Sequence, residues 1–197
     1  VYKRQIDKKA IPTYTARSLS EMLGQPFTDV YGDMNDLSSD KKQLIAEYKK
    51  LLTNEAVSKG DIHAGKAIYD RTCSACHVLY GKGGKIGPDL TGSNRADLNY
   101  ILLNMLDPSG DIPEAYQLVT VTKNDGQIIA GTVSDEDHQR LILNSIGLQN
   151  TVLKSDIKER ATPPYSMMPE VLLLKLPDKD VIDLVKYLRT SEPVATK

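Results

Sequence analysis

The sequence has no excess charge of either sign, no long hydrophobic run and few cysteines. Its 197 residues include 25 basic and 26 acidic side chains, a formal net charge of -1, and this balance gives no indication of a polyanion partner or a nucleic-acid surface. The longest clear apolar run, residues 171–174, is interrupted by Lys175 and falls far short of a membrane span. The 2 Cys are too few for a structural zinc site built from two cysteine pairs.

The two cysteines that are present form one compact motif. Two residues separate Cys73 from Cys76, and His77 follows at once. At this spacing two thiols can add to the two vinyl groups of one porphyrin while the next imidazole reaches the iron. Chance would produce the arrangement in roughly one of several thousand such compositions. The motif therefore predicts one covalently attached haem c, with His77 as an iron ligand. A zinc site and a redox-active dithiol are the alternatives.

Helical periodicity marks most of the remaining chain. The length and a hydrophobic content of 40% suffice for one globular domain with a core. Apolar side chains at helical spacing predict helices over residues 39–52, 97–106 and 178–189. A helix capped by Asp61 is expected over residues 61–75, and the poorly periodic first segment is expected to contain a short helix over residues 15–23. Gly65 lies on the helix that leads into the cysteine motif, and Tyr187 lies on the last helix. Since a glycine lets another helix approach closely, we expect these two helices to cross there.

A β-rich block interrupts the helical pattern. The runs with strand character cover residues 116–122, 127–133, 141–144 and 151–153. An Asn124-Asp125-Gly126 turn signal follows the first run and indicates a hairpin. We expect a small antiparallel sheet or a five-stranded barrel, inserted at about residues 114–160, that covers the haem edge or docks a partner.

The glycine-rich loop after His77 is a candidate for the proximal wall of a haem site. A metal-bound histidine needs a hydrogen-bond acceptor for its other ring nitrogen, and Pro88 is our candidate for that carbonyl and for an apolar contact to the porphyrin. Arg95 and Tyr100 are candidate donors to the haem propionates. The alternatives are a plain surface turn for the loop, a solvated arginine and a tyrosine at the core edge.

The other axial position of the iron decides between a carrier and a catalyst. Met168 precedes Pro169 in a proline-rich segment that cannot be helical. A thioether ligand leaves no vacancy on the iron and suits electron transfer. Met168 is our first choice for the sixth ligand and Met167 the second. His138 and His63 are the bis-histidine alternatives.

Several segments together resemble a known family. They are Gly65 with Cys76-His77, residues 83–92 (GGKIGPDLTG), Arg95, Tyr100, residues 106–109 (LDPS), Asp125-Gly126 with Gly131, residues 166–169 (SMMP) and residues 184–188. This set resembles the haem-binding cytochrome c domain at the C-terminus of large multidomain proteins of Planctomycetes and related bacteria. The resemblance implies a redox partner protein or a fused dehydrogenase domain as electron donor, and it implies fold and haem ligation more firmly than any substrate.

These observations together predict a mainly α fold. We expect a class I cytochrome c-like helical haem domain over residues 59–197, with the small antiparallel β insertion, and an N-terminal helical arm with a packing helix over residues 1–58. The expected function is transfer of single electrons through one haem c, its iron held by His77 and Met168. A haem enzyme or gas sensor with an open, peroxidase-like distal site is the alternative, and a zinc-stapled interaction module is a third hypothesis.

The chemistry also predicts a compartment. Covalent haem attachment normally takes place on the outer side of the bacterial cytoplasmic membrane, so we expect a periplasmic protein. The chain begins at Val1 with no signal-like apolar segment, and we expect a processed product or a piece of a longer protein.

Overall fold

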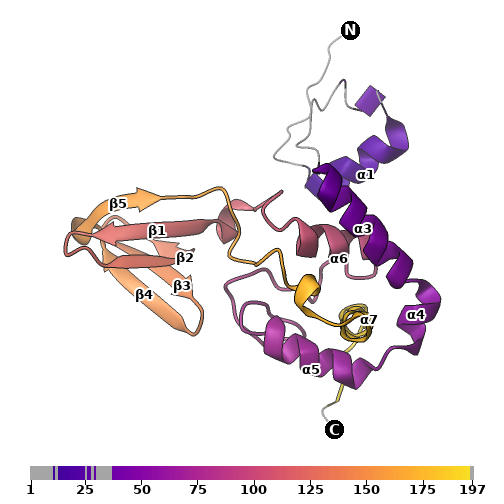
Figure 1. Cartoon of the computed structure of the whole chain (residues 1–197). Coiled ribbons are helices and arrows are strands. Elements are labelled where there is room, and N and C mark those ends of the chain that lie inside the picture. Colours follow the sequence, from indigo (N-terminus) through magenta and orange to yellow (C-terminus); the bar gives the residue numbers. More distant parts are fainter. Residues whose placement is uncertain (1–10, 12, 25, 28, 30–36, 196–197) are drawn as a thin grey trace.

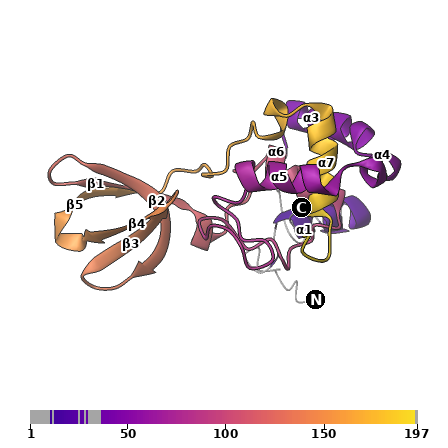
Figure 2. The same cartoon turned by 90° about the horizontal axis from the view of Figure 1, so that it is seen from below.

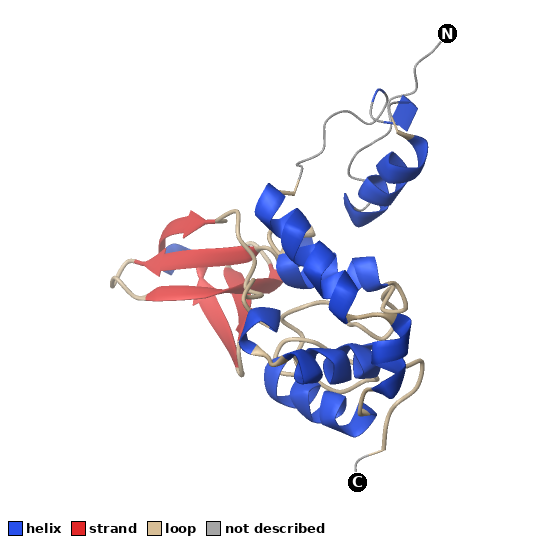
Figure 3. Cartoon of the chain, turned by 45° about the vertical axis from the view of Figure 1, so that its right-hand side comes forward, coloured by secondary structure: helices blue, strands red, loops and turns tan. Residues whose placement is uncertain are grey.

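The helices and the strands occupy separate sides of the molecule. The computed structural model describes residues 11, 13–24, 26–27, 29 and 37–195. The helices gather on one side, and a β-sheet stands apart on the other in all three views (Figures 1, 2 and 3). None of the described helices has the length and apolar character needed to cross a membrane.

The predicted helices are present with nearly the predicted bounds. They are α1 (Thr13–Leu23), α3 (Ser39–Leu51), α5 (Ile62–Thr72), α6 (Leu98–Leu106) and α7 (Asp178–Leu188), with a short α4 (Asn54–Lys59) that was not predicted. Side-chain caps explain where several begin, because they satisfy amide groups that have no partner inside the helix. Ser38 caps α3, Thr53 caps α4, Asp61 caps α5 and Asp97 caps α6.

Helices α5 and α7 cross at Gly65, as predicted from the sequence. Figure 2 shows α7 running across α5. A Cβ atom at Gly65 would overlap the backbone carbonyl of Asp183 and lie 2.9 Å from the Cβ of Tyr187. The Asp183 carboxylate, only 2% exposed, accepts from the backbone N–H of Asp61 (2.7 Å) and from Lys179 (2.5 Å). This crossing fixes the position of α5, the helix that ends at the cysteine motif.

One apolar core unites the helices of this side. Its fully buried members include Leu52, Ile68, Leu102, Leu106, Leu173 and Leu184. Helix α3 contributes Ile45 and Tyr48 and packs on α6. A separate small cluster of Ala16 and Phe27 accompanies α1. The part of the predicted N-terminal arm at residues 1–10 and 30–36 lies outside the described residues.

The β block forms an antiparallel sheet with its own core. Its strands are β1 (Leu118–Lys123), β2 (Ile128–Glu136), β3 (Arg140–Ser145), β4 (Leu148–Leu153) and β5 (Ile157–Ala161), in the order β4-β3-β2-β1-β5. The core consists of Val119, Val121, Leu141, Leu143 and Val152. Strands β4 and β5 lie at the two ends of this order, so hydrogen bonds do not close the five strands into a ring. In the hairpin between β1 and β2, Gly126 has a φ of 87°, a conformation that residues with a side chain rarely adopt.

The prediction of a mainly α fold was wrong. About 40% of the described residues are helical and about 20% have strand conformation, so the structure is a mixed α and β one. Two features of the sheet explain the underestimate. Strand β2 continues to Glu136 through a register shift between Val133 and Asp135, which breaks its apolar alternation. Strand β5 is almost wholly exposed and carries no apolar pattern to detect.

In the described part of the chain, three short 3₁₀ turns link these elements. They are Glu114–Tyr116 before β1, Lys154–Asp156 before β5 and Leu173–Lys175 before α7. The sheet meets the helical side at Thr132, whose buried hydroxyl lies 3.5 Å from the carbonyl oxygen of Ile86. Ile86 is itself buried and belongs to the glycine-rich loop that follows His77. The β block therefore touches the loop that was predicted to form the proximal wall.

Candidate haem-attachment site

The cysteine motif continues directly from the end of α5. Cys73 is the C-cap of that helix, and its N–H donates to the carbonyl of Tyr69 at 2.8 Å. The N–H groups of Cys76 and His77 both donate to the carbonyl of Cys73, at 3.1 and 3.0 Å. One tight turn of chain therefore carries both thiols and the imidazole, and the two cysteines are not joined by a disulfide.

The imidazole of His77 is held by the loop that follows it. Its Nδ1 lies 2.9 Å from the carbonyl oxygen of Pro88, the pairing that the sequence predicted. Because a carbonyl can only accept, Nδ1 carries the proton, and no described residue hydrogen-bonds to Nε2. A Cβ atom at Gly87 would lie 2.5 Å from Cε1 and 2.8 Å from Nδ1 of the ring. Only a glycine allows the backbone to support the ring this closely, and this cradle leaves Nε2 available to a metal.

Further bonds tie the loop to the motif. The N–H of Gly87 donates to the carbonyl of Cys76, and the N–H of Gly84 donates to that of Ser74, both at 2.8 Å. The hydroxyl of Tyr69 donates to the carbonyl of His77 at 2.9 Å. The sequence placed Tyr69 on one helix face with Gly65 but gave no signal for this contact, because it depends on how the chain turns after Cys76.

Burial sets the protonation of the motif. It raises the pKa of the Cys73 thiol to about 11 and that of Cys76 to a lesser degree, so both are protonated near neutral pH. Burial lowers the pKa of His77, against the opposing effect of the hydrogen bond to Pro88. The imidazole is therefore neutral near pH 7 and can offer the Nε2 lone pair to a metal. Two thiols and one such nitrogen on a single turn fit a covalently bound haem.

Arg95 is buried and fully engaged with the backbone. Its guanidinium donates to four carbonyls, those of Leu90, Thr91, Leu188 and Thr190. It also lies 5.3 Å from the ring centroid of Tyr80. These bonds join the loop after Pro88 to the end of α7. Tyr100 is half-buried on the first turn of α6. The propionate contacts assigned to Arg95 and Tyr100 stay predictions.

The candidates for the sixth ligand differ in their surroundings. Met168 is partly buried and packs against the helical core, and so does Cys73. Its N–H donates to Ser166 Oγ at 3.1 Å, and the N–H of Ser166 donates to Ser109 Oγ at 3.1 Å. Met167 does not join the residues that pack against this core. The segment therefore presents Met168 to the same core that borders the cysteine motif.

The two histidine alternatives lie on α5 and in the sheet, outside the segment that carries Met168. His63 is in the first turn of α5, ten residues before Cys73, which is about 15 Å along a helix. His138 is exposed in the turn between β2 and β3. Among the described residues, no group of three or more His, Cys, Asp or Glu side chains is placed to hold a metal ion. The zinc hypothesis therefore finds no donor set in that part of the chain.

The sequence matches a known protein family. A family model described as "Cytochrome c" matches residues 62–192, which extend from α5 through the sheet to beyond α7. No curated protein matches the sequence. Among solved structures, a crystal structure of the pleiotropic translational regulator Hfq is 22% identical, covering 36% of this chain and 97% of that chain with a TM-score of 0.23. A TM-score this low carries no argument about fold or function.

Proposed function

Because the chain belongs to the cytochrome c family, we propose that it carries single electrons on one haem c attached through Cys73 and Cys76, with His77 and Met168 as the two axial ligands. The family supports a haem-based electron-transfer role and covalent haem c with iron. Haem c, when bound, supplies an iron that gains and loses one electron without changing its bonds to the protein.

The observation that carries the proposal is the support of the His77 imidazole. Pro88 accepts from Nδ1 at 2.9 Å, and Gly87 leaves no room for the ring to tilt toward the loop. This fixes the tautomer, leaves the Nε2 lone pair without a hydrogen bond from the described residues and raises the basicity of the ligand. A redox dithiol would need neither a fixed histidine nor this glycine. A zinc site would use a fixed histidine too, but it would need further ligands, and the described residues contain no group of three or more His, Cys, Asp or Glu side chains placed to hold a metal ion.

Met168 has the complementary role of closing the distal side. Its thioether would be the second protein ligand of the iron, and with no open position left for water or small gases the protein would act as a carrier. Two hydrogen bonds hold the backbone at Met168: its N–H donates to Ser166 Oγ, and the N–H of Ser166 donates to Ser109 Oγ. The β insertion of about residues 114–160 lies between this segment and the proximal loop along the chain.

The donor and the compartment are parts of the same proposal. We infer that electrons come from a dehydrogenase domain or a partner protein of the multidomain kind that the sequence resembles, and that the chain works in the bacterial periplasm. The supporting argument is chemical: covalent attachment of haem c takes place outside the cytoplasmic membrane, and an outer-sphere carrier needs a separate group that oxidises a substrate.

The test compares two neighbouring methionines. The haem-loaded protein is expected to show a low-spin spectrum in both oxidation states and no reaction with CO. The Met168→Ala variant is expected to become high-spin when reduced and to bind CO, because its sixth position is open. Met167→Ala is the matched control and should keep the spectrum of the unaltered protein.

Two outcomes would contradict this assignment. One is an unaltered protein that binds CO at once and turns over hydrogen peroxide, which indicates the open distal site of a haem enzyme or gas sensor. The other is a low-spin spectrum that survives Met168→Ala but not Met167→Ala, which moves the sixth ligand by one residue.

A further inference from the structure

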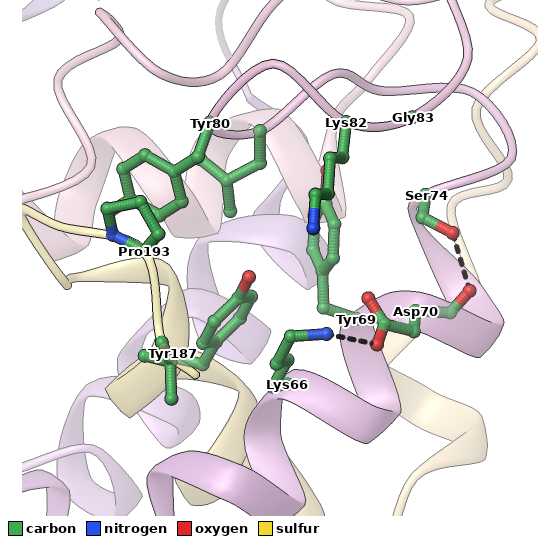
Figure 4. Close-up of a pocket in the computed structure, with 11 residues that line it drawn as sticks. Lys66, Tyr69, Asp70, Ser74, Tyr80, Lys82, Gly83, Tyr187 and Pro193 are labelled. Carbon is green, nitrogen blue, oxygen red and sulfur yellow. Dashed lines mark hydrogen bonds and ion pairs between the residues drawn. The ribbon is translucent and has the colours of Figure 1, made fainter. Parts of the chain in front are cut away.

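A second recess lies beside the cysteine motif and contains none of the proposed haem ligands. It has a volume of about 210 Å³ and lies between α5, α7, the loop at residues 79–83 and the C-terminal segment at Pro193 and Val194. Its walls include the rings of three tyrosines, Tyr69, Tyr80 and Tyr187 (Figure 4). Cys73, Cys76, His77 and Met168 do not line it. We refer to it as the tyrosine pocket.

The hydroxyl of Tyr187 points into this pocket and is open to solvent there, because no side-chain oxygen sealed inside the described part of the chain lacks a hydrogen-bond partner. The residue is only 4% exposed, and its hydroxyl has no hydrogen-bond partner among the described residues. Figure 4 shows it directed to the middle of the recess. The other two hydroxyls are engaged: Tyr69 donates to the carbonyl of His77 at 2.9 Å, and Tyr80 donates to that of Thr190 at 2.5 Å. Tyr187 therefore offers a free, oriented donor to an occupant.

The charges around the pocket leave one positive charge uncompensated. Lys66 is paired with Asp70, its Nζ 2.6 Å from a carboxylate oxygen, and that bond raises the pKa of Lys66. Lys82 has no ion-pair partner in the part of the chain that the structure describes. Its amine is directed into the same space as the Tyr187 hydroxyl (Figure 4). One carboxylate would neutralise Lys82 and accept from Tyr187 at the same time.

The volume of the pocket and its lining indicate which group should carry the carboxylate. Tyr69 and Tyr187 lie with ring centroids 5.5 Å apart and planes at 54°, and Leu79, Pro193 and Val194 complete an apolar lining. At about 30 Å³ per water, the volume corresponds to about seven waters, which is room for one ring and its substituent. Offset or edge-to-face contact with tyrosine rings favours an aromatic ring over an aliphatic chain.

We propose that the tyrosine pocket binds a small aromatic monocarboxylate, with the carboxylate between Lys82 and the Tyr187 hydroxyl and the ring against the tyrosines. This inference goes beyond electron transfer and does not depend on the sixth iron ligand. The site adjoins the motif through Ser74 and Tyr69.

The experiment uses benzoate as the probe and the full haem-loaded chain. Isothermal titration calorimetry and saturation-transfer NMR measure binding of benzoate and of benzamide, its neutral isostere. Benzamide is expected to bind at least about tenfold more weakly, because it lacks the charge that pairs with Lys82. Tyr187→Phe keeps the ring and removes one hydrogen bond, and should weaken benzoate about fivefold.

Two lysines that lie close in sequence provide the matched pair. Lys82→Gln should weaken benzoate several-fold, whereas Lys85→Gln removes an equally exposed charge outside the pocket and should have no effect. Both variants are on the surface, so neither should unfold the protein. The proposal is overturned by an absence of benzoate binding at millimolar concentration. It is also overturned if benzamide binds as well as benzoate, or if Lys85→Gln weakens binding as much as Lys82→Gln does.

Discussion

At the scale of single residues, Gly87 determines how the imidazole of His77 is held. We expect Gly87→Ala to displace the ring from the carbonyl of Pro88, because the new Cβ would lie 2.5 Å from the ring. Loss of that hydrogen bond makes the ligand less basic, so the midpoint potential of the haem-loaded protein should rise. Spectroelectrochemistry measures it. Gly92→Ala is the control, since a Cβ there meets nothing within 4 Å. Equal potentials for the two variants would refute this role.

Single residues also show what the sequence could and could not predict of the site. The bond from His77 to Pro88 was predictable, because a ligating histidine needs an acceptor and the loop offers one a short distance along the chain. The buried environment of Arg95 was not. A side chain that meets carbonyls from two separated segments depends on how those segments pack, and one sequence contains no record of that packing. The direction of the Tyr187 hydroxyl, into the tyrosine pocket, was not predictable for the same reason.

At the scale of elements, the helices were predictable because local chemistry fixes them. Asp61 and Asp97 cap α5 and α6 where the apolar spacing begins, and Pro108 follows the end of α6. The limits of the strands were harder to predict. Strand β2 continues beyond a register shift. Strand β5 is held in the sheet by its hydrogen bonds to β1, and its own residues show no apolar pattern. Strand pairing is a long-range property, so an exposed edge strand leaves little trace in its own residues.

The crossing of α5 and α7 gives a prediction at this scale. Gly65→Ala should destabilise the protein although alanine favours a helix by about 1 kcal/mol. The added Cβ meets the backbone carbonyl of Asp183, which cannot rotate away, so the helices must separate at a cost that typically reaches about 3 kcal/mol. Urea unfolding measures the net loss, expected to be about 2 kcal/mol. Gly92→Ala should stay within about 0.5 kcal/mol of the unaltered protein. A stabilised Gly65→Ala variant would show that the helices can separate freely.

At the scale of the whole molecule, two apolar cores support two parts of one chain. The helical core contains Leu102 and borders Cys73 and Met168, whereas the sheet core contains Leu143 and shares no buried residue with it. The two parts meet where Thr132 approaches Ile86. This arrangement supports the proposal that the β block is an insertion into a haem-binding domain, and it implies that damage to one core should spare the other.

Leu143→Ala tests that independence against Leu102→Ala. Both leucines are fully buried, so each truncation should remove about 2–5 kcal/mol of stability from its own core. Leu143→Ala is expected to speed amide exchange in β1 to β4 while α5 and α7 stay protected and the visible spectrum is unchanged. Leu102→Ala should have the opposite effect and perturb the spectrum, because its core holds the segments that carry Cys73 and Met168. Hydrogen exchange followed by mass spectrometry resolves the two regions. If Leu143→Ala accelerates exchange equally in α5 and α7, the sheet and the helices unfold as one cooperative unit, and the β block is an integral part of the haem fold rather than an insertion.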